Sequence, residues 1–389
     1  MTTLLAFIFV IGVLVFVHEL GHYLAARSVG IRVEKFSVGF PPRFFTFTSE
    51  DEGWLIQMYF FSRSSVGKWE WQSVWEKKVL VSGKIGTGTE YCLALFPLGG
   101  YVKMAGIIDE SMDTSITSAP DEFMSKSILS QIFVMSAGVI MNVLFAFFVY
   151  TALSYHFGKP VENPPTIISQ LVDKMPAKEA GILSGDKIIS INGEPVDNWN
   201  DMALKIQSIP VKKIILEIDR DGKHLTKQFT TSFRLDRAGV DTVGSIGIYP
   251  KMHYIDVNLL QAGVSGFNGT VEGFRIIVLS IKMLITGEAS LKELGGPIMI
   301  AQLAGKTAEA GIPTLLSFMA LISINLAFLN ILPIPGLDGG HIFLSIIQVI
   351  IRKPLSVKTR TIFQQIGMAF LLLLMFIVFY NDIGRLFIN

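Results

Sequence analysis

Val15-Phe16-Val17-His18-Glu19-Leu20-Gly21-His22-Tyr23-Leu24 places two histidines and a glutamate inside an apolar run. Residues four apart share one face of a helix, so His18 and His22 can bind one zinc ion together. Glu19, beside them, can act as the general base that takes a proton from water at such a metal. The apolar run from Thr3 to Ala26, in which these three and one tyrosine are the only ionisable residues, is long enough to span a bilayer. The stretch therefore predicts a membrane helix with a zinc site, and a chance match in a soluble helix is the less favoured interpretation.

The composition of the 389 residues is typical of a membrane protein. Half of the residues are hydrophobic, 17% are charged and the formal net charge is +1. This charge, together with the lack of a basic run interleaved with aromatic residues, argues against nucleic-acid binding. The single cysteine, Cys92, excludes an intramolecular disulfide and a cysteine-based zinc site. We expect the first apolar segment to be retained, because its start lacks the positive charges of a cleavable signal.

Four apolar segments predict four transmembrane helices, at residues 1–30, 129–157, 312–337 and 361–384. The second contains no charged residue, and Asn142 within it can reach a neighbouring helix. The third ends in a segment with two prolines, Pro333-Ile334-Pro335-Gly336-Leu337-Asp338-Gly339-Gly340. Prolines break a helix, and irregular backbone at membrane depth is tolerated where it lines a cavity. We therefore expect this segment to form a wall of the active site.

Residues 31–128 predict a β region that lies on the cytoplasmic side of the membrane or re-enters it. The alternating flanks and the Pro/Gly turn of Gly88–Met104 predict a β-hairpin. Its residues alone leave open whether it is an ordinary surface hairpin or an edge that binds an extended peptide by strand addition. The insert at residues 50–84 holds four of the five tryptophans, which predicts either a segment on the lipid headgroups or a small β subdomain, the latter slightly favoured.

A soluble α+β module is predicted at residues 160–250. Strands are expected at 167–172, at 185–196 around an Asn-Gly turn, and at 213–219. This order of elements resembles a PDZ-like domain of the circularly permuted bacterial kind, present in one copy.

The module is followed, at residues 251–311, by a predicted amphipathic linker helix (259–285) and a turn at 294–298. Residues 338–360 predict a short helix and a basic loop. Because short basic loops favour the cytoplasm, this loop would place the N-terminus, the C-terminus and the module outside.

A catalytic zinc ion takes three protein ligands and keeps one open position. Asp338 is the favoured third ligand, and His341 is the alternative because residues three apart share a helix face. Of the remaining histidines, His156 lies at the end of the second span, and His224 and His253 lie in or next to the soluble module. Asp338 also has a plain structural interpretation, as the N-cap of the helix that follows it.

With these residues the chain resembles the site-2 protease family of intramembrane zinc metalloproteases, in its bacterial regulator-of-sigma-E-protease branch. The resemblance covers nearly the whole chain and rests on His18–His22, Phe36–Phe40, Gly88–Met104, Ser136–Gly138 with Asn142, the PDZ-like pattern, and Asn325 through Gly340. It implies a polytopic α-helical membrane protein with four transmembrane helices, a membrane-associated β-hairpin and one α+β PDZ-like extracytoplasmic domain. Three departures are the single PDZ-like domain where the family often has two, the insert 50–84, and Val139 in place of the usual proline.

The resemblance also implies roles for particular residues. His18, His22 and Asp338 would bind Zn2+, and Glu19 would activate water. Residues implied to hold the unwound substrate are Asn325, Asn330, Pro333, Pro335 and, on the hairpin, Gly99, Gly100 and Tyr101.

The implied activity is zinc-dependent hydrolysis of peptide bonds in or near the transmembrane segments of single-span proteins, such as anti-sigma factors or signal-peptide remnants. The expected location is the cell membrane as a multi-pass protein, the inner membrane in a Gram-negative cell. The expected partners are membrane-embedded substrates and the lipid bilayer, with the ligand of the PDZ-like groove left open. A non-catalytic membrane PDZ scaffold is the alternative, and it predicts a damaged metal site. A metal transporter is disfavoured because the second span and residues 361–380 contain no acidic residue.

Overall fold

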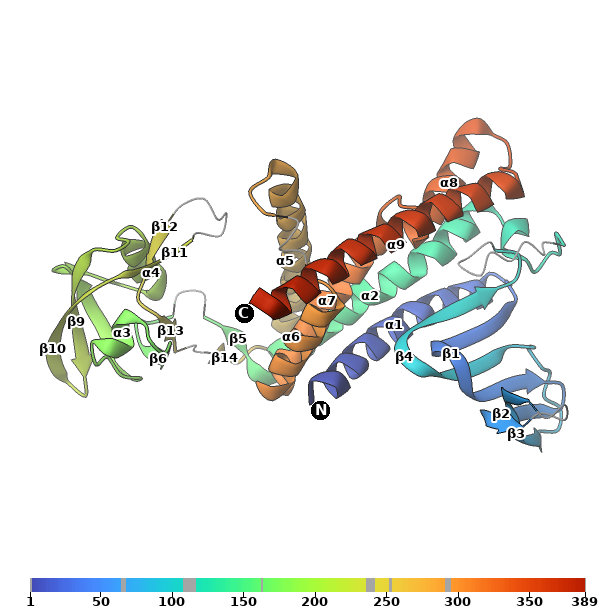
Figure 1. Ribbon diagram of the computed structural model, residues 1–389, viewed down its shortest axis with the longest axis horizontal. Helices are drawn as coiled ribbons and strands as arrows, with labels where there is room; N and C mark the ends of the chain where they lie inside the picture. Colours follow the sequence, from blue (N-terminus) through green and yellow to red (C-terminus); the bar gives the residue numbers. More distant parts are fainter. Residues whose placement is uncertain are drawn as a thin grey trace. The chain divides into compact units, whose positions relative to one another are not determined.

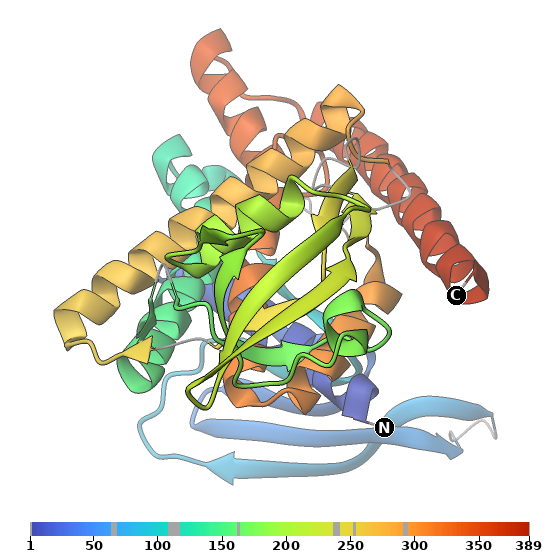
Figure 2. The ribbon, with the colours of Figure 1, turned by 90° about the vertical axis from the view of Figure 1, so that its left-hand side faces the viewer.

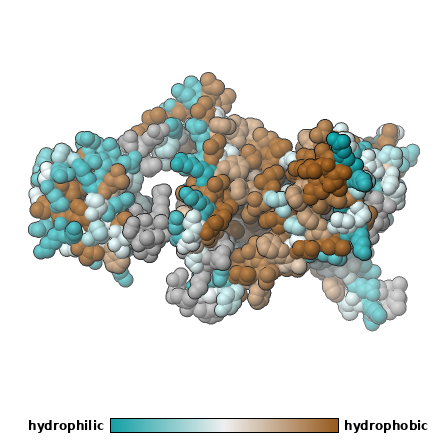
Figure 3. Space-filling model, turned by 90° about the horizontal axis from the view of Figure 1, so that it is seen from above, coloured by the Kyte–Doolittle hydropathy of each residue, from teal (hydrophilic) through white to brown (hydrophobic). Residues whose placement is uncertain are grey.

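The computed structural model describes residues 2–63, 68–107, 117–161, 164–235, 242–251, 254–290 and 295–388. The chain divides into two compact units (Figure 1). The first comprises residues 1–150, 266–274 and 294–389, and the second comprises residues 151–265 and 275–293. Figure 3 shows hydrophobic residues gathered over the helices of the first unit.

Within the residues that the structure describes, four helices are long and apolar enough to cross a membrane, as the sequence predicts. They are α1 (Thr2–Ser28), α2 (Ile128–Phe157), α7 (Ile312–Ile331) and α9 (Val357–Ile388). Helix α7 ends at the two prolines, and α8 (Asp338–Ile351) begins directly after the break. The predicted linker helix is α5 (Leu259–Thr286), which is not one of these four spans.

The turn predicted at residues 294–298 is wrong, because helix α6 (Pro297–Glu309) begins there; Leu294 itself lies outside the described residues. Proline suits the first turn of a helix, where its missing N–H is not needed. The buried carboxylate of Asp382 on α9 accepts hydrogen bonds from the backbone N–H groups of Gly296 (3.0 Å) and Ile298 (2.9 Å). Helix α6 is thus capped by a residue far along the chain, and its buried Ala304 joins a core with α1 and α7.

The segment between α1 and α2 folds into one four-stranded sheet in the order β3-β2-β1-β4. The strands are β1 (Val33–Glu50), β2 (Gly53–Arg63), β3 (Trp69–Leu80) and β4 (Glu90–Met104). The Trp-rich insert is therefore not a separate subdomain, because β2 and β3 extend the same sheet. Strand β4 is the opposite edge, and a short 3-10 helix, η1 (Phe123–Ser125), precedes α2.

The predicted hairpin at Gly88–Met104 is wrong in its pairing. The two arms of β4 do not pair with each other: residues 35–38 of β1 lie between them, with 90–93 on one side and 100–103 on the other. Strand β1 bends near Gly39, which has a φ of 93°, and returns to pair again with β4 along residues 45–48. The two strands interlock, which local alternation in the sequence does not reveal.

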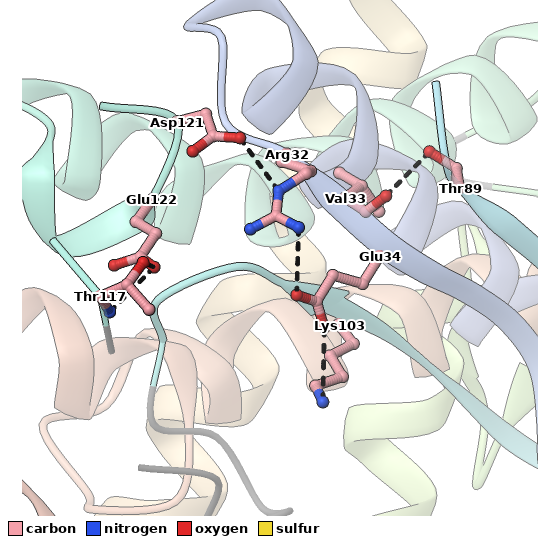
Figure 4. Close-up of polar contacts among 8 residues, drawn as sticks. All are labelled: Arg32, Val33, Glu34, Thr89, Lys103, Thr117, Asp121 and Glu122. Atoms are coloured by element: carbon pink, nitrogen blue, oxygen red, sulfur yellow. Dashed lines mark hydrogen bonds and ion pairs between the residues drawn. The ribbon is translucent and has the colours of Figure 1, made fainter. Parts of the chain in front are cut away.

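Polar contacts hold the sheet to the segment that leads to α2 (Figure 4). The Arg32 guanidinium contacts the carboxylates of Asp121 (2.9 Å) and Glu34 (3.8 Å), and Glu34 also pairs with Lys103 of β4 (3.4 Å). The Thr89 hydroxyl donates a hydrogen bond to the carbonyl of the first residue of β1 (2.8 Å). These contacts fix the base of the edge strand.

The second unit holds a compact α+β module (Figure 2), and the strands predicted at 167–172, 185–196 and 213–219 are observed there. Its main sheet has the order β10-β9-β7-β8, and Asn192 and Gly193 form the expected turn with φ values of 52° and 81°. The helices are α3 (Pro176–Glu179) and α4 (Trp199–Gln207). The strands are β5 (Lys159–Pro160), β6 (Ile168–Leu171), β7 (Lys187–Ile191), β8 (Glu194–Pro195), β9 (Lys213–Arg220), β10 (Lys223–Thr230), β11 (Ser232–Leu235), β12 (Thr242–Ser245), β13 (Ile248–Pro250) and β14 (Tyr254–Ile255).

Candidate active site

Three side chains from two distant parts of the chain converge in the first unit. His18 and His22 lie one turn apart on α1, and Asp338 is the first residue of α8. The Nε2 atoms of the two histidines are 3.2 Å apart, and Asp338 Oδ2 lies 3.2 Å from His18 Nε2 and 3.4 Å from His22 Nε2. Within the described ranges, no other group of three His, Cys, Asp or Glu residues converges in this way. His341 is not part of the group, and His253 lies outside the described residues.

The geometry and chemistry of these three atoms fit a zinc ion. Tetrahedral zinc bonds of about 2.0–2.1 Å place neighbouring ligand atoms about 3.3 Å apart, which is the spacing of this triangle. Asp338 Oδ2 is buried and has no hydrogen-bond partner. A buried carboxylate oxygen without a donor is unfavourable unless a cation neutralises it.

The other ring nitrogen of each histidine has a partner that orients it. His22 Nδ1 lies 2.9 Å from the carbonyl oxygen of Val134, so Nδ1 carries the proton and the lone pair of Nε2 points to the shared centre. The amide nitrogen of Asn142 lies 3.2 Å from His18 Nδ1. Both partners come from α2, the second membrane helix. Such contacts fix the ring positions of metal ligands before the metal binds.

Helix α2 packs directly against the imidazoles at Gly138. A Cβ atom at this position would lie 2.6 Å from His18 Cε1 and 2.8 Å from His18 Nδ1. At Gly21 of α1, a Cβ atom would lie 2.7 Å from Met141 Cγ. The crossing of the two helices therefore requires glycine on both sides. The sequence alone does not reveal that Gly138 contacts the imidazoles.

A cavity of about 290 Å³ joins the converging side chains to the edge of β4. Glu19 lines it next to the histidines, and Gly99, Gly100 and Tyr101 line it from the edge strand, as predicted. A Cβ atom at Gly100 would lie 3.6 Å from Glu19 Cγ, which shows how closely the edge strand approaches the glutamate. An extended peptide bound to this edge would therefore pass beside Glu19.

Burial raises the pKa of the Tyr101 phenol above its usual value. The phenol is therefore neutral at neutral pH. A neutral phenol can both donate and accept a hydrogen bond at the cavity wall.

The predicted substrate-binding residues on α7 and after it divide into two groups. Asn330 lines the cavity, and its amide nitrogen lies 3.2 Å from His18 Nε2. Asn325, Pro333 and Pro335 are not among the lining residues, which include Gly336 and Leu337 instead. The two prolines interrupt the helical backbone between α7 and α8, and the residues that follow them face the cavity.

Three further residues from different elements also line the cavity. Phe40 from the bend of β1, His341 from α8 and Gln364 from α9 line it. The sequence does not predict a role for Gln364, because a single amide side chain in an apolar helix belongs to no recognisable motif. His341, the alternative ligand predicted from its spacing, lines the cavity but is not part of the converging group.

Comparisons with known proteins agree along the whole chain. The profile of peptidase family M50 matches residues 6–67 and 60–374. The zinc metalloprotease RasP of Bacillus licheniformis is 30% identical over 430 residues, covering 100% of both chains. The regulator of sigma-W protease RasP of Bacillus subtilis is 31% identical over 427 residues, covering 99% of both. Among solved structures, a PDZ domain from Listeria monocytogenes matches 23% of this chain and 90% of its own at 20% identity, with a TM-score of 0.20.

RasP of Geobacillus kaustophilus, also named a zinc metalloprotease, is 30% identical over 422 residues and covers 99% of both chains. Because relatives with one named activity match this chain from end to end, the chain belongs to peptidase family M50 and is a site-2 type zinc metalloprotease.

Proposed function

We propose that this zinc metalloprotease hydrolyses peptide bonds inside or next to the membrane-spanning segments of single-span proteins. Zinc would be held by His18, His22 and Asp338, and Glu19 would serve as the general base. One observation carries the proposal: the converging triangle of side chains and the open edge of β4 line the same cavity. The intact set of ligand types argues against the alternative, a non-catalytic membrane scaffold.

The chemistry of the site follows from the residues around the cavity. Bound zinc would supply a Lewis acid that polarises the scissile carbonyl and lowers the pKa of water. Glu19 takes the proton from the attacking water and later returns it to the leaving amine. Asn330 donates a hydrogen bond from its amide nitrogen, which can stabilise negative charge on the substrate's carbonyl oxygen. His22 and His18 keep their orientation through Val134 and Asn142.

The edge of β4 would hold the substrate in an extended conformation. A transmembrane helix hides its carbonyls, so the substrate must unwind before it can be cut, and unwound backbone in a membrane needs new hydrogen bonds. Strand addition to residues 99–101 would supply them through main-chain groups. The same pairing would align the scissile bond beside Glu19.

The substrates we propose are membrane-anchored anti-sigma factors or signal-peptide remnants. A relative in Bacillus subtilis is named a regulator of sigma-W protease. We also propose that the PDZ-like module and both termini lie outside the cytoplasm. The exposed basic residues Arg352, Lys353 and Lys358 at the α8–α9 connection support this orientation, whereas Arg360 contributes less because it is buried.

The test compares the full-length wild-type protein with the Asp338→Ala and His341→Ala variants. Bound zinc and cleavage of a single-span test substrate are measured for each in detergent micelles. We expect one zinc ion and activity in the wild type, loss of both in Asp338→Ala, and retained zinc in His341→Ala. Zinc retained by Asp338→Ala and lost from His341→Ala would move the third ligand to His341. A folded wild type that binds no zinc and cuts no membrane-embedded substrate would favour the scaffold.

A further inference from the structure

The two strands inserted into the sheet, β2 and β3, form what we call the aromatic ribbon (Gly53–Arg63 and Trp69–Leu80). Where the ribbon pairs with β1, one of its faces is polar. Gln57 donates a hydrogen bond to Glu76 (2.8 Å) and lies 3.5 Å from the Thr46 hydroxyl. On the same face Lys78 pairs with Glu50 (2.9 Å). The polar side chains of this face are paired with one another, so the face can lie in contact with water.

The opposite face is apolar and uncovered. The strand register places Phe47 beside Ile56, and Trp75 in line with Phe45 of β1. Phe47 and Trp75 are 41% and 44% exposed, and Leu93 on the adjoining strand is 50% exposed. A contiguous apolar sheet surface of this kind marks an interaction site on a folded protein.

The apolar face lies on the same side of the sheet as the first membrane helix. Tyr91 shares this face with Phe47 through their register, and its hydroxyl lies 2.6 Å from that of Tyr23 on α1. The exposed apolar surface of the sheet is therefore continuous with a helix that spans the membrane. Lipid that surrounds α1 would also meet the ribbon.

The end of the ribbon carries aromatic side chains on both faces. Side chains alternate along β2, so Phe60 belongs to the apolar face and Phe61 to the other. Their side chains are 55% and 54% exposed, and Trp69, which the register places on the same face as Phe61, is 68% exposed. A protein docked against one face would leave the aromatics of the other in water. A fluid lipid interface covers both.

Two lysines lie beside apolar side chains of this face, where their ammonium groups could reach lipid headgroups. Lys77 is exposed beside Ile56, and the Lys84 ammonium lies 3.5 Å from the centre of the Trp54 ring. Lysine and tryptophan together favour the membrane–water interface, where the ammonium group reaches phosphates and the ring stays at the acyl boundary.

We propose that the aromatic ribbon is a lipid-binding surface that lies in the headgroup layer of the bilayer. The ribbon and the edge of β4 are on opposite margins of one sheet (Figure 1). Lipid binding at one margin therefore sets the depth of the other margin in the membrane. The surface is independent of the zinc chemistry, because none of its residues lines the catalytic cavity.

Tryptophan fluorescence tests this directly, because four of the five tryptophans lie in the ribbon. A full-length variant that keeps only Trp75 is reconstituted into vesicles of phosphatidylcholine and phosphatidylglycerol with brominated acyl chains, which quench nearby indoles. We expect at least about twofold quenching, strongest for bromines near the glycerol end. A variant that keeps only Trp69 provides a second, independent reporter at the end of the ribbon.

Two controls use the same tryptophan-free background. Phe376→Trp on α9, an exposed position in a membrane span, should be quenched and verifies reconstitution. Lys78→Trp on the polar face should be quenched much less, and zinc content verifies folding. If Phe376→Trp is quenched but Trp75 and Trp69 are not, the proposal is wrong. Shielding of Trp75 from aqueous acrylamide without lipid quenching would instead show that protein covers this face and would also overturn the proposal.

Discussion

Replacing Gly138 by alanine should damage the zinc site without unfolding the protein. The added methyl group would lie 2.6 Å from His18 Cε1, whereas non-bonded atoms normally separate by about 3.5 Å. One ring or one helix must therefore move by about 1 Å. The rings cannot yield freely, because His22 Nδ1 is bound to the carbonyl of Val134 and His18 Nδ1 lies against Asn142.

A displacement of about 1 Å far exceeds the tolerance of about 0.2 Å in metal–ligand distances. We expect zinc affinity to fall by about 10–100-fold or more, and cleavage by about 100-fold at saturating zinc. Alanine favours a helix over glycine by about 1 kcal/mol, so the helix content should not fall. The loss of function would then come from the site and not from the fold.

The assay is zinc titration of the purified full-length protein with a competing chelator, followed by cleavage of a single-span substrate. Gly12→Ala on α1 is the matched control, because a Cβ atom there meets nothing within 4 Å. Wild-type zinc affinity and cleavage rate in Gly138→Ala would refute the reasoning and place the histidines farther from α2.

Three further changes test other parts of the molecule. Glu19→Gln should retain zinc but lose about 10²–10⁴-fold in cleavage rate, measured with equal zinc loading; unchanged cleavage would exclude Glu19 as the base. A Cβ atom at Gly100 would lie 2.5 Å from the backbone oxygen of Ser37 and 3.3 Å from Val15 Cγ1, so Gly100→Val should displace the edge of β4 beside Glu19 and lower kcat/KM at least about tenfold with zinc unchanged. In the module, burial opposes ionisation of Asp186, but hydrogen bonds from Arg220 (both 2.7 Å) hold the pKa of Asp186 below its usual value. Its stabilisation is therefore complete above the unfolded value of 3.8 and is lost as the pH falls below it. Asp186→Asn should destabilise the module by about 1.5–3 kcal/mol at pH 7, seen as faster hydrogen exchange in β7 and β9; equal exchange rates would contradict this.

The sequence predicted best what depends on local pattern or on residue chemistry. The spacing of His18 and His22 requires only a helix, and the four spans require only length and apolarity. Few residues near membrane depth can bind zinc, which favours Asp338 as the third ligand, and the structure brings Asp338 to the two histidines.

The sequence failed where a partner far along the chain decides the outcome. The arms of β4 look like a hairpin, but a bend in β1 places another strand between them. Helix α6 shows no capping residue of its own, because Asp382 supplies the cap from 86 positions away. In the sequence Gly138 looks like a small residue that lets two helices pack closely, and only the structure shows that it contacts the imidazoles. Each of these features is a tertiary contact that no periodicity encodes.

The convergence of His18 and His22 with Asp338 has a consequence for biosynthesis. The two parts of the site are 316 positions apart (338 − 22), one at the start of the chain and one near its end. During translation the first membrane helix is in the bilayer long before the carboxylate has left the ribosome. A growing chain in which residue 338 has not yet been made therefore lacks one of the three proposed zinc ligands. We expect activity only once Asp338 on α8 has reached the two histidines on α1.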